Sequence, residues 1–186
     1  EKWIKDAINS QEFEGSAYAL LENAEPICME EEHVHGETHE DEDHDYSHEH
    51  EVHSHDEYDE HVWLSLKNAK DFCEDITKLL YDINPVETYN ENCKSYIKKL
   101  DGLDKQFQSV IWQDEENVII FADRFPFRYL AADYDLEWYA AFPGCSAETE
   151  ASFDTIKELT KIVKDMKVRG VFVTETGDDS LAKTVI

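Results

Sequence analysis

The chain has 186 residues, enough for one domain or two small ones. Its formal net charge is −27 at pH 7, because 44 acidic residues stand against 17 basic ones. Such an acidic chain excludes nucleic acid and anionic lipid as direct partners and is compatible with attracting cations.

The two ends of the sequence have short amphipathic patterns. Residues 3–8 keep helical spacing and predict a helix that ends near Asn9, and residues 17–21 predict a short strand. A further helix is predicted to begin within residues 179–186. Because both end patterns are interrupted, we expect an internal fragment of a longer protein. We expect no signal peptide or membrane span within these residues, and in a fragment the missing targeting signal says nothing about location.

The most unusual stretch is residues 30–61, which contains all nine histidines, fifteen of the 44 acidic residues and no lysine or arginine. Imidazole nitrogen suits zinc, copper and nickel, and carboxylates add ligands and negative potential. No single spacing defines one geometry, so we expect several weak, exchanging metal sites. Eight of these histidines lie two to five residues apart: His33, His35, His39, His44, His48, His50, His53 and His55.

The same composition would also suit a solvated acidic loop with no metal role. Acidic segments that are poor in aromatic residues cannot bury a core and stay disordered. Loops of this length are usually functional or disordered, and we expect both. The gathering of every histidine into residues 33–61 favours metal binding over a neutral linker.

Two helical patterns follow this tract. From Ser65, apolar residues at helical spacing predict a core-facing helix with Ser65 as its N-cap and Pro85 as its stop. Residues 87–112 predict a second helix of some 25 residues, roughly 37 Å long at 1.5 Å per residue. A helix of this length would be able to run along two lobes and hold them at a fixed separation.

The remaining sequence alternates between strand and helix patterns. Buried strands are predicted at residues 117–121, 136–142 and 170–174, and helices at residues 125–134 and 152–167. This order predicts an α/β fold with parallel strands and right-handed crossovers.

Polar residues follow each of the predicted strands. Asp123 follows the first strand, residues 144–150 follow the second, and Glu175 follows the third. Ligands of parallel sheets bind beyond the carboxyl ends of the strands. We therefore expect these polar residues on one rim of the sheet.

The four cysteines, Cys28, Cys73, Cys93 and Cys145, form no CxxC pair, which excludes zinc-finger and thioredoxin-type motifs. Cys73 and Cys93 fall within helical patterns, where a buried thiol acts as a small apolar residue. Cys145 is either a turn residue or the partner of a cysteine outside this fragment.

Five landmarks in this order resemble one known family over nearly the whole chain. They are the HVWLS motif at residues 61–65, the long helix from Glu87, and the segments FADRFPFRYL (121–130), FPGCSAETE (142–150) and VFVTE (171–175). The family is that of the metal-binding solute receptors of bacterial ABC importers for zinc and manganese. The His-rich loop directly before the HxWL motif resembles the zinc-specific branch.

The resemblance implies two parallel-sheet α/β lobes bridged by one long rigid helix, both lobes being incomplete in this fragment. Residues 1–86 would be the C-terminal part of the N-terminal lobe, including the disordered loop 30–60. Residues 87–112 would be the linking helix, and residues 113–186 the first part of the C-terminal lobe. The whole protein would be a monomer outside the cytoplasm, either periplasmic or lipid-anchored, that delivers metal to a membrane permease.

The resemblance also implies a set of metal ligands. The histidine of the HxWL motif corresponds to His61, while the first and last ligands of the family would lie outside this fragment. The third ligand, a His or Glu, aligns with Arg124 when residues 127–129 are matched. Because arginine cannot bind a cation, Asp123 is the expected substitute.

Glu148, Glu150 and Glu175 are further candidate ligands. Each of them, taken separately, is better explained as a helix cap, a contact behind the site or part of a charged rim. Trp63 and Leu64 are expected to pack and to hold the backbone near His61.

These residues predict a receptor that captures Zn(II) through imidazoles and a carboxylate, with the tract raising the local zinc concentration. Manganese is disfavoured because it prefers oxygen ligands, and nickel remains open. The alternative from another class is a metal buffer or chaperone that acts through the tract, which predicts several ions of similar affinity. An enzyme is not expected, because no HExxH or comparable zinc-hydrolase motif is present.

Overall fold

A computed structural model describes residues 2–10, 15–26, 58–113, 117–144, 151–175, 177 and 179–186. The helices are α1 (Lys2–Ile8), α2 (Leu66–Ile83), α3 (Glu87–Ile111), α4 (Arg128–Tyr134), α5 (Phe153–Met166) and α6 (Ser180–Val185). Two 3-10 turns, η1 (Leu21–Asn23) and η2 (Val62–Leu64), and two strands, β1 (Val118–Phe125) and β2 (Glu137–Pro143), complete the description. None of the helices in these ranges is long and apolar enough to cross a membrane.

The predicted parallel α/β sheet is confirmed. β1 and β2 pair in parallel, with Val118 opposite Glu137 and a register shift between Phe121 and Arg124. Phe172 adds a parallel bridge on β1, because its N–H donates to the Ile120 carbonyl at 2.8 Å. The predicted third strand over residues 170–174 is therefore wrong in extent, since it is reduced to this bridge.

The first strand is longer than the sequence predicts. It continues past Phe121 to Phe125, because Ala122 and Phe125 are buried against neighbouring elements. The prediction that Asp123 follows the strand is wrong, since Asp123 lies inside β1. The next helix begins only at Arg128, because Pro126 keeps the chain before it extended.

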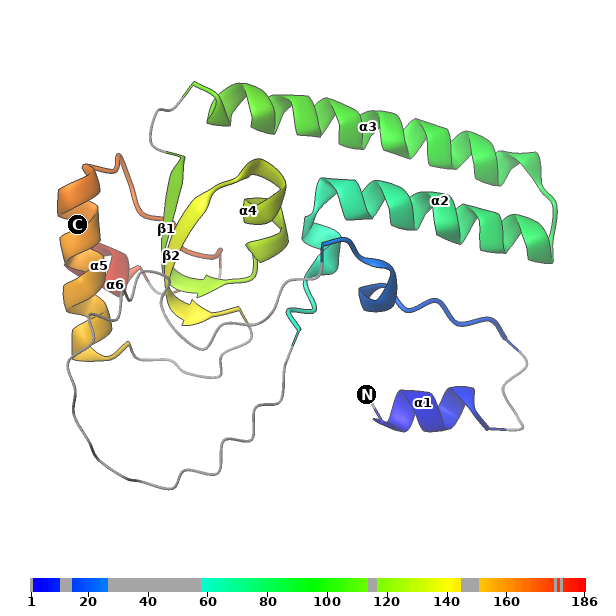
Figure 1. The fold of residues 1–186 in the computed structure, drawn as a ribbon, viewed down its shortest axis with the longest axis horizontal. Coiled ribbons are helices and arrows are strands. Elements are labelled where there is room, and N and C mark those ends of the chain that lie inside the picture. The colour runs from blue at the N-terminus through cyan, green and yellow to red at the C-terminus, as the bar shows by residue number, and fades with distance from the viewer. Residues whose placement is uncertain are drawn as a thin grey trace.

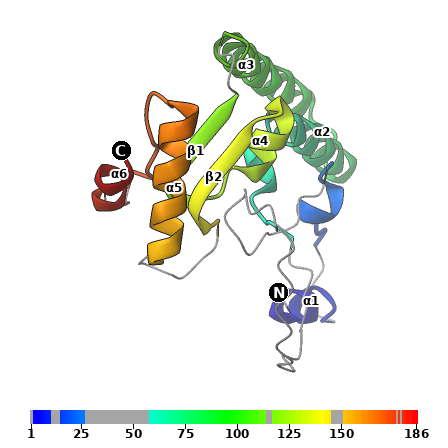
Figure 2. The same cartoon turned by 60° about the vertical axis from the view of Figure 1, so that its left-hand side comes forward.

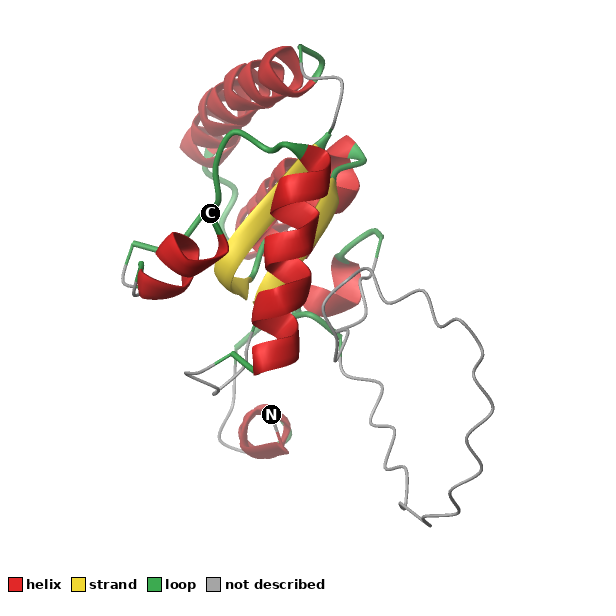
Figure 3. Cartoon of the chain, turned by 90° about the vertical axis from the view of Figure 1, so that its left-hand side faces the viewer, coloured by secondary structure: helices red, strands yellow, loops and turns green. Residues whose placement is uncertain are grey.

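Helices cover both faces of the strands (Figures 2 and 3). On one face α5 and α6 bury a core that includes Ile120, Ala141 and Leu159. On the other face Phe121 and Phe125 form an aromatic cluster with residues of α4 and with Trp138 of β2. Alternate residues of each strand point to opposite faces, so a single short strand contributes side chains to both cores.

The predicted helices on either side of Pro85 are confirmed and form an antiparallel hairpin (Figure 1). The Ser65 hydroxyl accepts the Asn68 N–H at 3.0 Å and caps α2, as predicted. Toward its C-terminal end α3 packs on α4, where the Phe107 and Tyr134 rings stack with centroids 5.6 Å apart.

The predicted strand over residues 17–21 is wrong. This segment makes no strand pairing within the described residues, and it turns at Leu20 into η1. Its apolar side chains pack on α2 instead, and the Tyr18 ring meets Phe72 edge-on with centroids 6.4 Å apart. The predicted terminal helices are confirmed as α1 and α6.

Candidate functional site

His61 lies at the carboxyl end of the sheet, although it belongs to the segment that precedes α2. A Cβ added to Gly144, which follows β2, would lie 3.3 Å from His61 Cε1 and 3.1 Å from the Phe125 carbonyl oxygen at the end of β1. The imidazole therefore packs where both strands end, and 17% of its side chain is exposed. Open α/β sheets bind their ligands at this edge.

Asp59 holds both the backbone and the ring of His61. Asp59 Oδ1 accepts the His61 backbone N–H at 2.8 Å and lies 2.8 Å from His61 Nδ1. The Asp59 side chain is 2% exposed. On another side the Trp63 ring lies 5.6 Å from the imidazole. The ring is therefore bounded by Asp59, Trp63 and Gly144.

Two long-range hydrogen bonds tie the His61 turn to α4. The Tyr129 hydroxyl donates to the Asp59 carbonyl oxygen at 2.7 Å, and the Ser65 hydroxyl donates to Asp133 Oδ2 at 2.8 Å. Tyr129 is buried, and the Asp133 side chain is 2% exposed. Because these bonds are shielded from water, the turn that carries His61 is held firmly against the body of the sheet.

Asp123 has a different environment. Its Oδ1 accepts the Arg124 N–H at 2.8 Å, and its Oδ2 accepts the Thr174 N–H at 2.9 Å as well as the Thr174 hydroxyl. Burial by itself raises the pKa of Asp123, but the hydrogen bonds from Thr174 and Arg124 and the Arg124 charge hold that pKa below its ordinary value. Oδ2 therefore joins β1 to the segment that follows Phe172, while Oδ1 is used within β1 itself.

Gly177 closes the space next to the Asp123 carboxylate. A Cβ added to Gly177 would overlap Asp123 Oδ2 and lie 3.0 Å from Thr174 Oγ1. Only glycine allows the backbone to approach this closely. A metal ion at Asp123 Oδ2 would have to displace this segment of the chain.

The other predicted ligand, Glu175, does not form a group of metal-binding side chains with His61 in the described residues. Glu175 is exposed in a turn. Across the part of the chain that the structure describes, no three His, Cys, Asp or Glu side chains gather into a group able to hold a metal ion. His61, Asp123 and Glu175 are therefore not brought together as one such group, and the last two stay predictions as ligands.

The remaining predicted site residues lie outside the described residues, and their roles stay predictions. They are the eight histidines of the tract together with Cys28, Cys145, Glu148 and Glu150.

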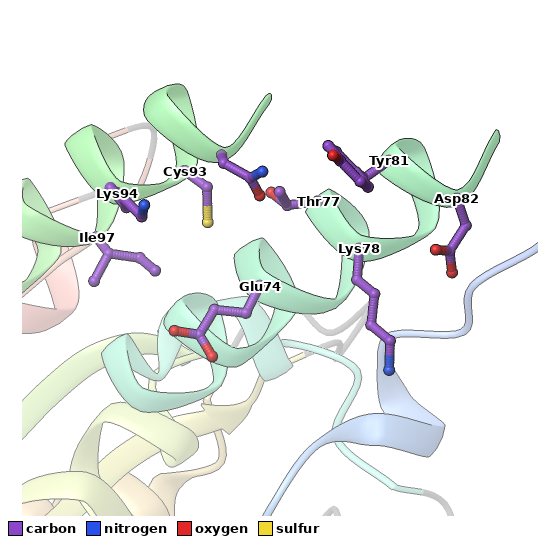
Figure 4. Close-up of a pocket in the computed structure, with 9 residues that line it drawn as sticks. Glu74, Thr77, Lys78, Tyr81, Asp82, Cys93, Lys94 and Ile97 are labelled. Atoms are coloured by element: carbon purple, nitrogen blue, oxygen red, sulfur yellow. The ribbon is translucent and has the colours of Figure 1, made fainter. Parts of the chain in front are cut away.

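A cavity of about 300 Å³ opens between α2 and α3 (Figure 4). Its lining mixes charges of both signs with a thiol, and it includes Glu74, Lys78 and Cys93 but not His61. Cys73 and Cys93 are free, half-buried thiols, as their helical positions predict, and burial raises the pKa of Cys73.

A larger hollow of about 800 Å³ lies at the amino end of β1. It is lined by apolar side chains such as Val110, Ile119 and Phe172, with Lys167 and Arg169 among them. It is therefore at the opposite end of the strands from His61.

Sequence reasoning missed Asp59, Tyr129, Gly144 and Gly177. In the sequence Asp59 is one more acid of the tract. Its position two residues before His61 is informative, because an aspartate side chain often accepts a backbone N–H two residues later. The two glycines follow predicted strands, where close approach of another group is common.

Comparison with known proteins matches the whole chain to one family. The family described as ZnuA, zinc-uptake complex component A, periplasmic, covers residues 1–186. Zinc-binding lipoprotein AdcA of Streptococcus pneumoniae serotype 4 is 35% identical over 133 residues, 70% of this chain and 26% of that protein. The manganese ABC transporter substrate-binding lipoprotein scaA of Streptococcus gordonii is 32% identical over 133 residues, 68% of this chain and 42% of that protein.

A solved structure agrees with these relatives. The crystal structure of the Zn(II)-bound ZnuA-like domain of Streptococcus pneumoniae AdcA matches with a TM-score of 0.55 and 33% identity, covering 69% of this chain and 48% of that chain. The fold and the family match define an α/β protein of the ZnuA type. The chain belongs to the ZnuA family, and it spans 26% and 42% of the length of the two curated relatives.

Proposed function

We propose that this chain is part of an extracytoplasmic receptor that captures Zn(II) for uptake by an ABC transporter, with His61 as a principal ligand. The observation that carries the proposal is the position of the His61 imidazole. It lies at the carboxyl edge of a parallel sheet, on a turn held by a buried carboxylate. Membership of the family and the zinc-binding relative AdcA support zinc as the cargo.

The same proposal covers the architecture and location of the whole protein. We propose residues 1–86 as part of one lobe, 87–112 as the linking helix and 113–186 as part of the second lobe. The receptor acts outside the cytoplasm, in the periplasm or lipid-anchored, as a monomer that docks on a membrane permease and performs no catalysis. Both relatives are named as lipoproteins, and scaA as a substrate-binding lipoprotein of an ABC transporter, which supports this location.

Two alternatives have specific support. A manganese receptor is supported by the relative scaA, and it would suit an oxygen-rich ligand set. A metal buffer is supported by the histidine tract at residues 30–61, where several ions would bind with similar affinity.

Zinc calorimetry on the complete protein tests the proposal. The variants are His61→Ala and a deletion of residues 31–57, which leaves Asp59 in place because it contacts the His61 ring. His33→Ala is the matched control, since it also removes one imidazole but at the far end of the tract. Manganese and zinc are titrated in parallel.

One tight zinc site is expected that survives the deletion and the His33→Ala change. His61→Ala is expected to weaken this site by about 100-fold or more, because an inner ligand is lost. If the deletion of residues 31–57 abolishes tight zinc binding and His61→Ala leaves it unchanged, the receptor proposal is wrong and the metal-buffer alternative is supported. If manganese binds more tightly than zinc in the intact protein, the cargo assignment is wrong.

A further inference from the structure

The contact between Asp59 and His61 constrains the chemistry of the imidazole. A neutral imidazole carries its proton on one nitrogen and its lone pair on the other. His61 Nδ1 lies 2.8 Å from Asp59 Oδ1, and an ionised carboxylate is only an acceptor. Nδ1 must therefore carry the proton, and Nε2 then holds the lone pair.

We propose that Asp59 is the positioning residue of the metal site, which fixes His61 in the Nδ1–H form and directs Nε2 toward the zinc ion. This inference rests on the proposed function, in which His61 is a ligand. Metal-binding histidines commonly donate their second ring N–H to a carboxylate, which sets the tautomer and makes the ligand more basic.

The surroundings of Asp59 are suited to this role. Asp59 Oδ1 also accepts the His61 backbone N–H at 2.8 Å, so a single oxygen holds the residue at two points. The carbonyl oxygen of Asp59 accepts the Tyr129 hydroxyl at 2.7 Å, and Tyr129 is 1% exposed. The Tyr129 bond holds the Asp59 backbone, and the carboxylate cannot turn away from the ring without losing its bond to the His61 N–H.

The other side of the ring is limited as well. The Gly144 backbone leaves just enough room for the imidazole, since an added Cβ would come within 3.3 Å of His61 Cε1. A ring held on both sides loses little rotational freedom when it binds a metal ion. Such pre-organisation increases affinity without adding a contact to the ion.

A purely structural role for Asp59 makes a different prediction. If Asp59 only closed the turn by accepting the His61 N–H, its loss would lower stability and leave the tautomer unchanged. Asp133 provides the matched control, because its side chain is also 2% exposed and anchors the same turn through Ser65. Asp133 bonds to Ser65 and Lys67 rather than to the imidazole.

The test measures the tautomer and the zinc affinity separately. Long-range ¹H–¹⁵N NMR on the complete, metal-free protein at about pH 8, above the ordinary histidine pKa, reports which ring nitrogen carries the proton. The His61 signals are identified by their loss in His61→Ala. Asp59→Ala, Asp59→Asn and Asp133→Ala are compared with the parent protein, and zinc affinity is measured by calorimetry on each.

The parent protein is expected to show the Nδ1–H form. Asp59→Ala should change to a mixture of tautomers and lose zinc affinity by about 10- to 100-fold. Asp59→Asn keeps an oxygen that accepts both bonds, so it should retain the tautomer and most of the affinity. Asp133→Ala should lower stability but leave the His61 tautomer and the zinc affinity at the parent values.

Two outcomes would overturn the inference. One is an Nε2–H form in the parent protein. The other is a parent-like tautomer or affinity in Asp59→Ala when His61→Ala has lost zinc binding. If instead Asp59→Ala changes the tautomer while His61→Ala binds zinc normally, the proposed function is what fails, because His61 is then not a ligand.

Discussion

His61 and Asp123 belong to the same carboxyl region of one sheet, yet the fold uses them in opposite ways. His61 directs ring nitrogen Nδ1 to the side chain of Asp59, two residues earlier. Asp123 directs both oxygens to the main chain of Arg124 and Thr174. The first arrangement orients an imidazole that we propose as a metal ligand, whereas the second joins two segments of the backbone.

The comparison shows that proximity to a strand end does not by itself identify a metal ligand. A buried carboxylate must have hydrogen-bond partners, and backbone N–H groups nearby are strong donors. A side chain can bind a metal ion readily only if its acceptor atoms are not already hydrogen-bonded within the fold. The following predictions test this distinction in order of decreasing effect.

Gly177→Val is expected to have the largest effect. Its side chain would overlap the Asp123 carboxylate, so the free energy of unfolding should fall by about 3 kcal/mol. Urea unfolding at neutral pH measures the loss. Gly102→Ala is the control, because nothing lies within 4 Å of its added Cβ in α3, and it should gain about 0.5–1 kcal/mol. Parent-like stability in Gly177→Val would mean that this backbone does not pack on Asp123.

Asp123→Ala should lower the free energy of unfolding by about 2 kcal/mol, because three hydrogen bonds to a charged group are lost. Zinc affinity of the complete protein should stay within about threefold of the parent value. Urea unfolding and calorimetry on the same samples separate the two effects. A loss of zinc affinity beyond tenfold with little change in stability would instead identify Asp123 as a ligand.

Gly144→Ala should act on the site more than on the fold. The added methyl group would push on the His61 ring, so zinc affinity should fall by about tenfold, at the lower end of what indirect contacts contribute. The free energy of unfolding should change by less than about 1 kcal/mol. Gly170→Ala is the control, since nothing lies within 4 Å of its added Cβ. Unchanged affinity in Gly144→Ala would show that the ring tolerates displacement.

Tyr139 on β2 gives the smallest expected effect, and only at alkaline pH. Burial and a hydrogen bond to Glu137 raise the pKa of Tyr139 from 10.0 to about 12. The folded state thus disfavours tyrosinate, so the stabilisation is complete below pH 10 and is lost as the pH rises through about 12. Between about pH 9 and pH 10.5, the decline in unfolding free energy should be smaller in Tyr139→Phe, by under about 1 kcal/mol. Equal declines in both proteins would contradict the raised pKa.

The regular helices were predictable from local sequence. Ser65 and Ser152 each accept the N–H three residues later, and these caps depend on neighbours within one turn. Pro85 separates α2 from α3 for an equally local reason, the missing N–H of proline. The alternation of elements after residue 117 was enough to predict parallel pairing.

The strand predictions were less successful because a strand needs a partner. Residues 17–21 and 170–174 have suitable composition, but the first packs on α2 and the second makes one bridge to β1. A short apolar segment does not determine which neighbouring element will pack against it. The end of β1 was missed for the same reason, since Asp123 is kept in the strand by contacts with Thr174.

The sequence by itself determined the helices with their caps, the α/β class and the resemblance to a metal-receptor family, and it singled out His61 as a predicted ligand. These depend on residue type and short spacing, which are visible along the chain. Only the tertiary structure decided that Tyr129 holds the turn of Asp59 and His61 against α4, and that Asp123 anchors the backbone of Thr174. Tyr129 is 70 residues from Asp59 and Thr174 is 51 residues from Asp123. Partners this distant meet only when the core packs, so both anchoring contacts are properties of the fold.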